Sequence, residues 1–480
     1  MTDELATTLA NFTTKGYVIA PAGYGKTHLI ALAVKQSKGR QLILTHTFAG
    51  VNSIKTKMAL LGVHSSKYQV DTIASWALRL CLAYPKNSEW SIDNPSTKQW
   101  NQLYESCQKL IHKQFIRDII HFSYSGIYVD EYQDCSEQQH TLISVLSGLL
   151  PCRILGDPLQ AIFDTIEKSV DWDVSIYPHF KCLGELEVPW RWNNAGAPEL
   201  GSWLNQARRI LLAGEKIDLT GSLPKGLSTV SVDLDDFSDR TRLKTFYKTF
   251  PNQETVMAIQ AGDQRSKSKT HTLARSLTGK FSSIEEVECK DLFLFVKKLE
   301  NAKTTKEAFQ YVLEFSKKCI TGVDGILTTG TKRGEVAQQT RVTKYPEILN
   351  AANNYLIVPT SQSLRNFLYL VKEHSETNIF RRDLLNRFFN VLRVHIVGEA
   401  STIHDAAQIY QREFRHSGRP LKHRKLIGTT LLVKGLEFDH AIILDANSLD
   451  AKQLYVAITR GAKTLTILTN SKLPPNLLIL

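Results

Sequence analysis

Two short stretches of the chain carry residue types that together can bind and cleave a phosphate chain. In the first, residues 17–30, an apolar run leads through a glycine-bearing loop to the triplet GKT. Glycines allow backbone N–H groups to converge on an anion, and a helix that starts at Lys26 adds the positive end of its dipole. Lys26 can reach the outer phosphates, and the Thr27 hydroxyl can hold a bridging magnesium ion. The predicted phosphate-binding loop consists of Ala22, Gly23, Tyr24, Gly25, Lys26, Thr27 and His28.

The loop departs from the common pattern GxxxxGK[ST] at its first position, where Ala20 stands in place of glycine. A glycine-rich turn that only caps a helix is the alternative interpretation. The GKT triplet directly after a strand favours the phosphate-binding loop.

The second stretch is VDEYQD, residues 129–134, in which an apolar strand ends in two adjacent carboxylates. Asp130, at the strand end, is placed to hold the magnesium ion, and Glu131 to take a proton from an attacking water. A DE pair at a strand end is common by accident. The DE pair becomes significant because a predicted phosphate-binding loop lies upstream of it. Together the two stretches predict hydrolysis of a phosphate bond.

Apolar strands that alternate with helices must position these residues. Four such strands end in polar residues, at 17–19, 41–47, 126–131 and 152–157. Open parallel sheets bind ligands at the carboxyl ends of their strands, so the pattern predicts a doubly wound parallel sheet with the site at that edge. Residues 85–125 interrupt the pattern with a polar turn and a helical run, which we interpret as a small insertion.

A second set of strands, near residues 254, 426, 440 and 464, predicts a second α/β unit. Between these strands the apolar spacing is helical, as in DLFLFVKKLENA, which predicts a helical insertion in the second unit. The expected domains are 1–188 with its insertion 85–125, 189–275, the helical insertion 276–420, and 421–480.

Composition limits the classes of protein to consider. The 480 residues carry a formal net charge of +12, which favours a nucleic-acid partner without establishing one. No apolar run reaches the ~18 residues that a membrane span needs, and the first residues lack the features of a signal peptide. Seven scattered cysteines form no CxxC pair. We therefore expect a cytoplasmic protein with reduced thiols and no membrane partner.

The end of the helical insertion is basic, since residues 381–425 hold ten Arg and Lys against four acids. A solvated helix face and a surface for the phosphate backbone of DNA explain this composition equally well. In the second interpretation, Arg412 and Arg415 contact DNA.

Eight segments of the chain, read in order, carry a shared resemblance. They are APAGYGKT (20–27), THTFAGVNSIKTKM (45–58), VDTIASWALRL (70–80), VDEYQD (129–134), GDPLQAIF (156–163), VPWRWNN (188–194), LLVKGLEFDHAII (431–443) and LYVAITRGAKTL (454–465). In this order they resemble the successive motifs of the UvrD/Rep/PcrA superfamily 1 DNA helicases. The resemblance implies two RecA-like parallel-sheet domains of the P-loop NTPase type, with ATP and Mg²⁺ bound between them.

The resemblance also implies roles for single residues. Gln160 would contact the terminal phosphate, and Arg191 and Arg460 would reach across from the second domain as arginine fingers. Trp190 would stack on adenine, and Glu437 would bind the ribose. The further contacts expected are Gly435 on the nucleotide and Thr47, Thr72, Phe163, Thr429, Arg412 and Arg415 on the DNA.

Several positions on the DNA side depart from the family pattern. Thr165 and Ile166 stand where an aromatic residue and an arginine are usual, which removes one base-stacking platform. Ala74 and Leu431 replace histidines, and His46 occupies a position often given to phenylalanine. The sixteen residues before the first strand contain no glutamine, which leaves selectivity for adenine open. The nucleotide side is therefore kept, whereas the DNA side is altered.

We therefore predict a cytoplasmic ATP hydrolase that moves 3′ to 5′ on single-stranded or partly duplex DNA. In outline the chain resembles the short helicase-like subunits of Gabija-type anti-phage defence systems, which implies an OLD-family nuclease as partner. The alternative is an ATP-dependent sensor or regulatory subunit of a nuclease complex with little unwinding of its own. A small-molecule phosphotransferase would leave Arg191 and Arg460 without a purpose.

Overall fold

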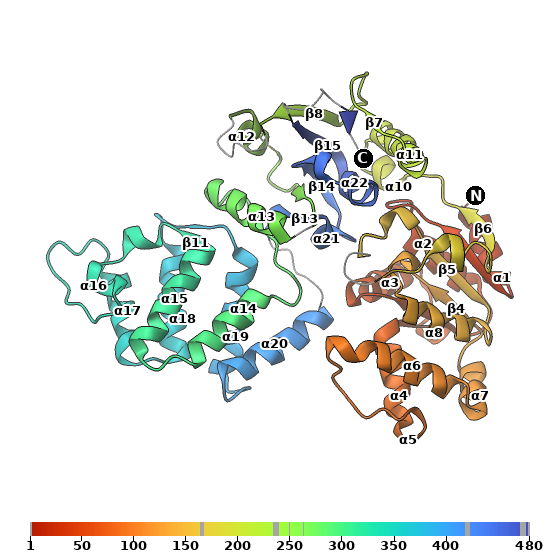
Figure 1. The fold of residues 1–480 in the computed structure, drawn as a ribbon, viewed down its shortest axis with the longest axis horizontal. Coiled ribbons are helices and arrows are strands. Elements are labelled where there is room, and N and C mark those ends of the chain that lie inside the picture. The colour runs from red at the N-terminus through yellow and green to blue at the C-terminus, as the bar shows by residue number, and fades with distance from the viewer. Residues whose placement is uncertain are drawn as a thin grey trace.

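The part of the chain that the structure describes folds into two six-stranded parallel sheets and a helical unit (Figure 1). The computed structural model describes residues 2–163, 168–233, 240–248, 250–262, 264–417, 423–470 and 477–478. The strand orders are β3-β2-β4-β5-β1-β6 and β10-β13-β9-β14-β15-β8. Neighbouring strands within each of these sheets run parallel. This architecture confirms the predicted α/β class with two RecA-like sheets.

Helices cover both faces of the first sheet. Every residue of β2 (Gln41–Thr45), β4 (Gly126–Val129) and β5 (Cys152–Gly156) is buried, as expected for central strands of a parallel sheet. The other strands are β1 (Lys15–Ile19), β3 (Tyr68–Thr72) and β6 (Lys181–Glu185). The helices are α1 (Thr2–Asn11), α2 (Lys26–Gln36), α3 (Phe48–Leu60), α4 (Ile73–Ala83), α5 (Pro85–Ser88), α6 (Trp100–Ile111), α7 (Gln114–Ser123), α8 (Glu137–Ser147) and α9 (Trp172–Ser175).

The strand order determines where the two chemical stretches meet. Strand β5 lies between β1 and β4 and pairs with both in parallel. With ~4.8 Å between neighbouring strands, the carboxyl ends of β1 and β4 lie roughly 10 Å apart at the same edge. The loop before α2 and the carboxylates after β4 therefore face a common space.

The second sheet is assembled from segments on either side of the helical unit. Its strands are β8 (Leu227–Val232), β9 (Val256–Gln260), β10 (Ser282–Ser283), β13 (Lys425–Thr429), β14 (Phe438–Ile443) and β15 (Gly461–Asn470). Its helices are α10 (Trp190–Asn194), α11 (Pro198–Leu212), α12 (Arg240–Tyr247), α13 (Gln264–Ser276), α21 (Thr430–Val433) and α22 (Ala451–Ile458). Strands β7 (Ile217–Asp218) and β16 (Leu477–Leu478) form a separate antiparallel pair.

The two sheets share one apolar cluster. It contains residues of α2 together with residues of α11, α22 and the second sheet. At the boundary, the rings of Tyr24 and Trp192 meet edge to face with centroids 6.3 Å apart. The phosphate-binding loop is thus packed against the unit that contributes Arg191.

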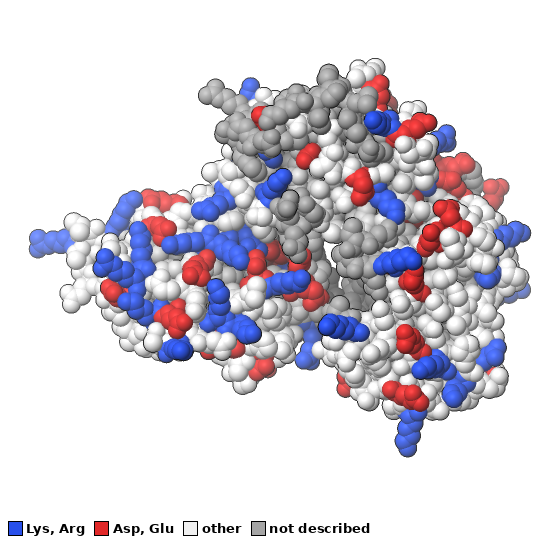
Figure 2. Space-filling view, in the orientation of Figure 1, with Lys and Arg blue, Asp and Glu red and all other residues white. Residues whose placement is uncertain are grey.

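The helical unit, on the left of Figure 1, has its own apolar core. It consists of α14 (Lys290–Glu300), α15 (Thr305–Cys319), α16 (Thr329–Lys332), α17 (Pro346–Ile357), α18 (Ser361–Glu373), α19 (Arg382–Ile396) and α20 (Ile403–Ser417), with the antiparallel pair β11 (Ile320–Thr321) and β12 (Asn378–Ile379). It occupies the place predicted for the helical insertion. Figure 2 shows Lys and Arg side chains spread over this unit among acidic ones.

Two arginines of the basic segment 381–425 are internal. Arg381 is 2% exposed and donates two hydrogen bonds of 2.7 Å to the Glu285 carboxylate and one of 2.6 Å to Asp291. Arg387 is also buried and donates to Asp383 at 2.9 Å. These two side chains hold the base of the helical unit together and are not part of a DNA-facing surface.

Replacing Arg381 with Ala is expected to lower the free energy of unfolding of the helical unit by about 3–5 kcal/mol. The change leaves the carboxylates of Glu285 and Asp291 without their buried cation. Calorimetric unfolding of the full chain measures the effect. Arg412→Ala is the matched control, since Arg412 is exposed on α20 and its loss should change stability by no more than ~0.5 kcal/mol. Equal stability of the two variants would contradict the assignment.

Among the described residues, no helix combines the length and the apolar character needed to cross a membrane.

Candidate nucleotide-binding and catalytic site

The loop between β1 and α2 has the backbone shape that an anion cradle requires. Gly23 and Gly25 adopt left-handed conformations, with φ of 79° and 88°. Side chains disfavour this region, so both positions need glycine. Gly25 is the N-cap of α2, which makes Lys26 and Thr27 the first two residues of the helix. Ala20 is buried and its N–H donates to the Gly156 carbonyl at 2.9 Å, so the alanine there extends the sheet.

The loop has three further residues to consider, Ala22, Tyr24 and His28. Ala22 and Tyr24 are buried, and burial raises the pKa of Tyr24 to about 12. His28 is half-buried on α2, and burial followed by the charge of Lys57 lowers its pKa. Both side chains are therefore uncharged near neutral pH, which leaves Lys26 as the charge carried by this loop.

Lys26 and the two carboxylates after β4 meet in one cluster. The Lys26 Nζ atom lies 2.6 Å from Glu131 Oε1 and 3.4 Å from Asp130 Oδ1. Burial opposes every charge here, but Lys26 and Lys434 outweigh it at Glu131 and lower the pKa of that carboxyl to about 2. At Asp130 burial prevails and raises the pKa. Glu131 is therefore ionised at neutral pH.

The backbone of Glu131 is strained. Its φ of 54° and ψ of 42° are left-handed, which costs a non-glycine residue on the order of 1–3 kcal/mol. Two contacts hold it there: the Glu131 N–H donates to Asp130 Oδ1 at 2.9 Å, and Gln133 Nε2 donates to Glu131 Oε2 at 2.5 Å. Gln133 Oε1 in turn accepts from the Asp157 N–H at 3.1 Å. Gln133 was not singled out in the sequence, although it lies within VDEYQD.

Lys434 of the second sheet reaches into this cluster and was also missed. Its ammonium group donates to Asp134 and to the Gln160 carbonyl, and it lies 4.8 Å from the centre of the Phe163 ring. Burial raises the pKa of Asp134 to about 6, an effect that Lys434 opposes. The sequence feature that could have indicated Lys434 is its place in the motif VKGLEFD, directly before Gly435. Lys434 connects the second sheet to the loops that follow β4 and β5.

Replacing Lys434 with Ala is expected to weaken the contact between the two sheets and to reduce DNA-stimulated ATP hydrolysis about tenfold or more. The reason is that Asp134 would remain buried without its cation. Steady-state hydrolysis and the radius of gyration from X-ray scattering measure the two effects. Adding Asp134→Asn removes the stranded charge and should restore part of the loss, whereas purely additive changes would show that the two residues are not coupled.

A second contact between the sheets involves Arg208 on α11. It donates to Asp157 at 3.1 Å and to Glu185 at 2.9 Å. Asp157 is fully buried and also receives Gln160 Nε2 at 3.4 Å. The side chain of Gln160 is thereby directed toward Asp157, while its carbonyl accepts from Lys434.

The two predicted arginine fingers occupy different environments. Arg191 donates to the Thr459 carbonyl at 2.7 Å and pairs with Glu437 at 3.0 Å, and its N–H donates to the Gly23 carbonyl at 3.0 Å. Arg460 is 2% exposed, and its guanidinium donates to the Val456 and Leu436 carbonyls. Burial and the charge of Arg191 lower the pKa of Arg460 to about 9. Arg191 therefore lies beside the loop, whereas Arg460 is bound within its own unit.

The expected adenine and ribose contacts lie at the same edge. Trp190 is 43% exposed, and a Cβ built on Gly25 would lie 3.3 Å from its Cδ1 atom. Glu437 is exposed apart from its pair with Arg191, and Gly435 has a left-handed φ of 77° with open space around its Cα. Trp190 and Arg191 thus flank the phosphate-binding loop from the second unit.

The predicted DNA-binding threonines begin helices after the carboxyl ends of strands. The Thr47 hydroxyl accepts from the Gly50 N–H at 3.1 Å, and the Thr72 hydroxyl accepts from the Ser75 N–H at 3.0 Å. Thr429 ends β13 and is the N-cap of α21. Arg412, by contrast, is exposed on α20 of the helical unit.

The structure describes only some of the positions singled out on the DNA side. Thr165 and Ile166 fall outside the described residues, as does the side chain of Arg415. His46 is described: its Nε2 atom lies 3.4 Å from Cys135 Sγ, and burial lowers its pKa to about 4. His46 is therefore a neutral packing residue next to Glu131.

Part of this site has a recognisable relative. Residues 91–164 match the UvrD/REP helicase N-terminal domain. In this segment the chain is similar to the UvrD-like helicases. The segment contains Asp130, Glu131, Gln160 and Phe163, and the match supports a helicase or translocase that hydrolyses a nucleotide. A search of curated protein sequences gave no match.

Several solved structures resemble the chain. They include the arterivirus nonstructural protein 10 helicase, in complex with DNA and in a separate crystal structure, and the PRRSV helicase. The arterivirus structures are 10% identical and have TM-scores of 0.35 over 97% of this chain, and the PRRSV helicase is 10% identical with 0.33 over 98%. This chain spans 62%, 61% and 54% of those three chains. The fold assignment rests on the strand order of the two sheets.

Proposed function

We propose that this chain is an ATP-dependent DNA translocase of the UvrD-like class that moves 3′ to 5′ on single-stranded or partly duplex DNA. The observation that carries the proposal is the cluster of Lys26, Asp130 and Glu131 with Arg191 from the second unit beside it. In this proposal residues 1–188 are the first motor domain, 189–275 and 421–480 the second, and 276–420 the helical insertion.

Each residue of the cluster has a task in hydrolysis. Lys26 binds the outer phosphates, a role that competes with its contact to Glu131 and frees that carboxylate. Glu131, ionised at neutral pH, accepts the proton of the attacking water. Arg191 leaves Glu437 to neutralise charge on the transferring phosphoryl group. The strained backbone of Glu131 holds its carboxylate ready for this step.

The donor set fits a magnesium ion. Magnesium prefers oxygen ligands and is commonly held by few protein groups together with substrate phosphates. The Thr27 hydroxyl at the start of α2 and the Asp130 carboxylate supply two such oxygens, and the described residues contain no cluster of three or more His, Cys, Asp or Glu that would suit another metal. The ion would neutralise negative charge on the phosphates.

The contacts of Lys434 support coupling between hydrolysis and movement. Lys434 joins the second sheet to Asp134 and to the Gln160 carbonyl, and Phe163 lies beside it. Departure of the terminal phosphate changes the charge around Glu131 and Gln160. This change shifts the equilibrium between an arrangement of the sheets in which the Lys434 contacts are made and one in which they are broken. A strand held near Thr47, Thr72 and Thr429 would be advanced by each cycle.

ATP hydrolysis by the purified chain, with and without single-stranded DNA, tests the proposal. We expect hydrolysis that DNA stimulates in the natural chain and that Lys26→Ala abolishes. A Lys38→Ala variant, changed at a lysine beyond the end of α2, is the control and should keep full activity. Direction is tested by displacement of streptavidin from either end of a biotinylated strand. Hydrolysis that does not depend on DNA would contradict the proposed coupling. Displacement of streptavidin from the 3′ end alone, and not from the 5′ end, would contradict the proposed direction.

A second candidate is an ATP-dependent regulatory subunit of a nuclease complex, with an OLD-family nuclease in an anti-phage system as the partner. The observation that favours it is the outer face of α7, where Phe115, Ile119 and Phe122 are 41%, 38% and 92% exposed. Ile116 and Ile120 fill the inner face, and of the outer residues Phe115 packs against Tyr84 while Phe122 is the most exposed. A stable complex that Phe122→Ser disrupts, with ATP hydrolysis but no strand displacement, would favour this candidate.

A further inference from the structure

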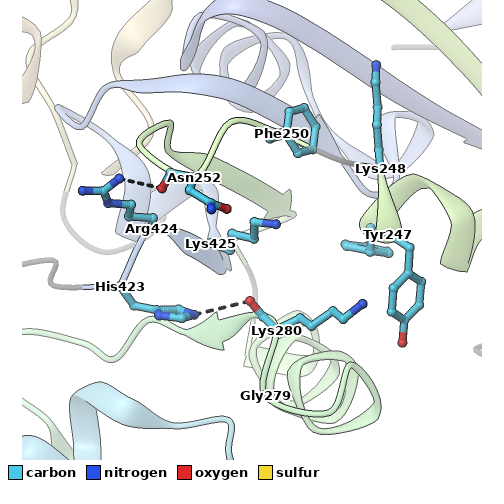
Figure 3. A pocket seen from close by; sticks show the side chains of 10 residues that line it. Tyr247, Lys248, Phe250, Asn252, Gly279, Lys280, His423, Arg424 and Lys425 are labelled. Carbon is cyan, nitrogen blue, oxygen red and sulfur yellow. Dashed lines mark hydrogen bonds between the residues drawn. The ribbon is translucent and has the colours of Figure 1, made fainter.

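A basic and aromatic pocket lies at the amino ends of three neighbouring strands of the second sheet (Figure 3). It has a volume of about 630 Å³, within the range of pockets that hold small ligands. Its walls come from the end of α12, the segment before β9, the turn between α13 and β10, and the segment that leads into β13. The residues that carry the argument are Tyr247, Lys248, Phe250, Lys280, Arg424 and Lys425.

Four cations line this pocket, and none of its described lining residues is an Asp or Glu. Among the described residues, no Asp or Glu forms an ion pair with Lys248, Lys280, Arg424 or Lys425, and no acid is part of the lining. Arg424 donates only to a backbone carbonyl, that of Asn252, at 2.5 Å. Figure 3 shows Lys280 and Lys425 extending into the space between Asn252 and Tyr247. Unpaired charges of one sign in a concave site attract an anion.

Aromatic rings form the other part of the lining. Tyr247 is 43% exposed, and Lys280 Nζ lies 4.0 Å from the centre of its ring. Phe250 is buried and its ring lies against His440 with centroids 4.3 Å apart, so this side of the pocket is fixed by the core. An exposed ring beside cations can stack on a planar group whose phosphates the cations hold.

The pocket is separate from the site around Lys26. It lies at the amino end of β13, where Lys425 pairs with Val256, whereas the predicted DNA contact Thr429 is at the carboxyl end of the same strand. Four residues of extended chain separate these ends by roughly 13 Å. None of the residues singled out for ATP or for DNA lines the pocket, although Arg424 and Lys425 are the last two residues of the basic segment 381–425.

We propose that this pocket binds a nucleotide, with its phosphates on Lys280, Arg424 and Lys425 and its base stacked on Tyr247. The cations, which form no ion pair with a described acid, attract the phosphates. The exposed tyrosine ring favours a ligand with a planar ring that can stack on it. The nucleotide has two possible sources, a free nucleoside phosphate or one unit of a single strand. The proposal does not depend on hydrolysis at Lys26.

Photolabelling of the full-length Lys26→Ala chain tests the site and separates the sources. The probes are 2-azido-ATP for a free nucleotide and a short oligothymidylate with 5-iodouracil for a strand. We expect one probe to label the peptide that contains Tyr247 and to be displaced by its unmodified counterpart. Labelling by 2-azido-ATP assigns a free nucleotide, and labelling by the oligonucleotide assigns a strand. Failure of both probes to label this peptide would overturn the proposal.

A paired variant tests the role of the cations. Lys280→Ala with Lys425→Ala should weaken binding of the labelling probe about tenfold or more, because two charge-assisted contacts are lost. Lys216→Ala with Lys225→Ala removes the same charge from exposed positions of the same unit and should leave binding unchanged. Equal binding by the two pairs would overturn the proposal, whereas failure of the ATP hydrolysis test at Lys26 would leave this site standing.

Discussion

Replacing Arg191 with Ala is expected to lower the rate of DNA-stimulated ATP hydrolysis by roughly 10³- to 10⁵-fold, the range attributed to arginine fingers. Arg191 lies beside the phosphate-binding loop. Its guanidinium pairs with Glu437, donates to the Thr459 carbonyl and lies 5.5 Å from the centre of the Trp192 ring, all within its own unit. Its loss therefore removes charge stabilisation without disrupting the core. Single-turnover hydrolysis with saturating ATP measures the effect, and thermal unfolding should be nearly unchanged.

Arg460 provides the comparison that makes this prediction specific. Its guanidinium donates to the Val456 and Leu436 carbonyls and is almost fully buried, so Arg460→Ala should lower the melting temperature as well as the activity. Arg209→Ala, at an exposed position on α11, is the matched control for the loss of one positive charge. If Arg191→Ala hydrolyses ATP within tenfold of the natural chain, Arg191 is not a finger.

Glu131→Gln is expected to slow hydrolysis by roughly 10²- to 10⁴-fold while ATP still binds, because the amide cannot accept a proton. The amide keeps the size of the carboxylate and can still contact Gln133, so the strained backbone should persist. Hydrolysis rates measure the loss, and binding of a fluorescent ATP analogue shows that the loop is intact.

The control for this variant is Glu137→Gln, which makes the same change at an exposed acid six residues downstream. Glu137 pairs only with Lys168, which is itself exposed, so its loss should alter the rate by less than about twofold. Full DNA-stimulated hydrolysis by Glu131→Gln would remove the catalytic assignment, and Asp130 would then be the residue to test as the base.

The strands that could be predicted from the sequence are the central ones. Strands β1, β2, β4 and β5 of the first sheet and β9, β13, β14 and β15 of the second all fall on predicted apolar runs. A central strand of a parallel sheet is buried on both faces, so its sequence is a continuous run of apolar residues. Strands β3, β6 and β8 are edge strands, and their mixed polar sequences gave no comparable signal.

The sequence by itself predicted a phosphate-binding loop and the carboxylates of VDEYQD, because each of these motifs consists of residues adjacent in the chain. Contacts between distant segments were decided only by the tertiary structure. Lys434 meets Asp134, and Arg208 meets Asp157, because two separately folded sheets pack together. The same holds for Arg381, whose charge suggested a surface but whose partners Glu285 and Asp291 place it inside. A sequence shows which residues carry charge, whereas burial and pairing depend on which surfaces the fold brings into contact.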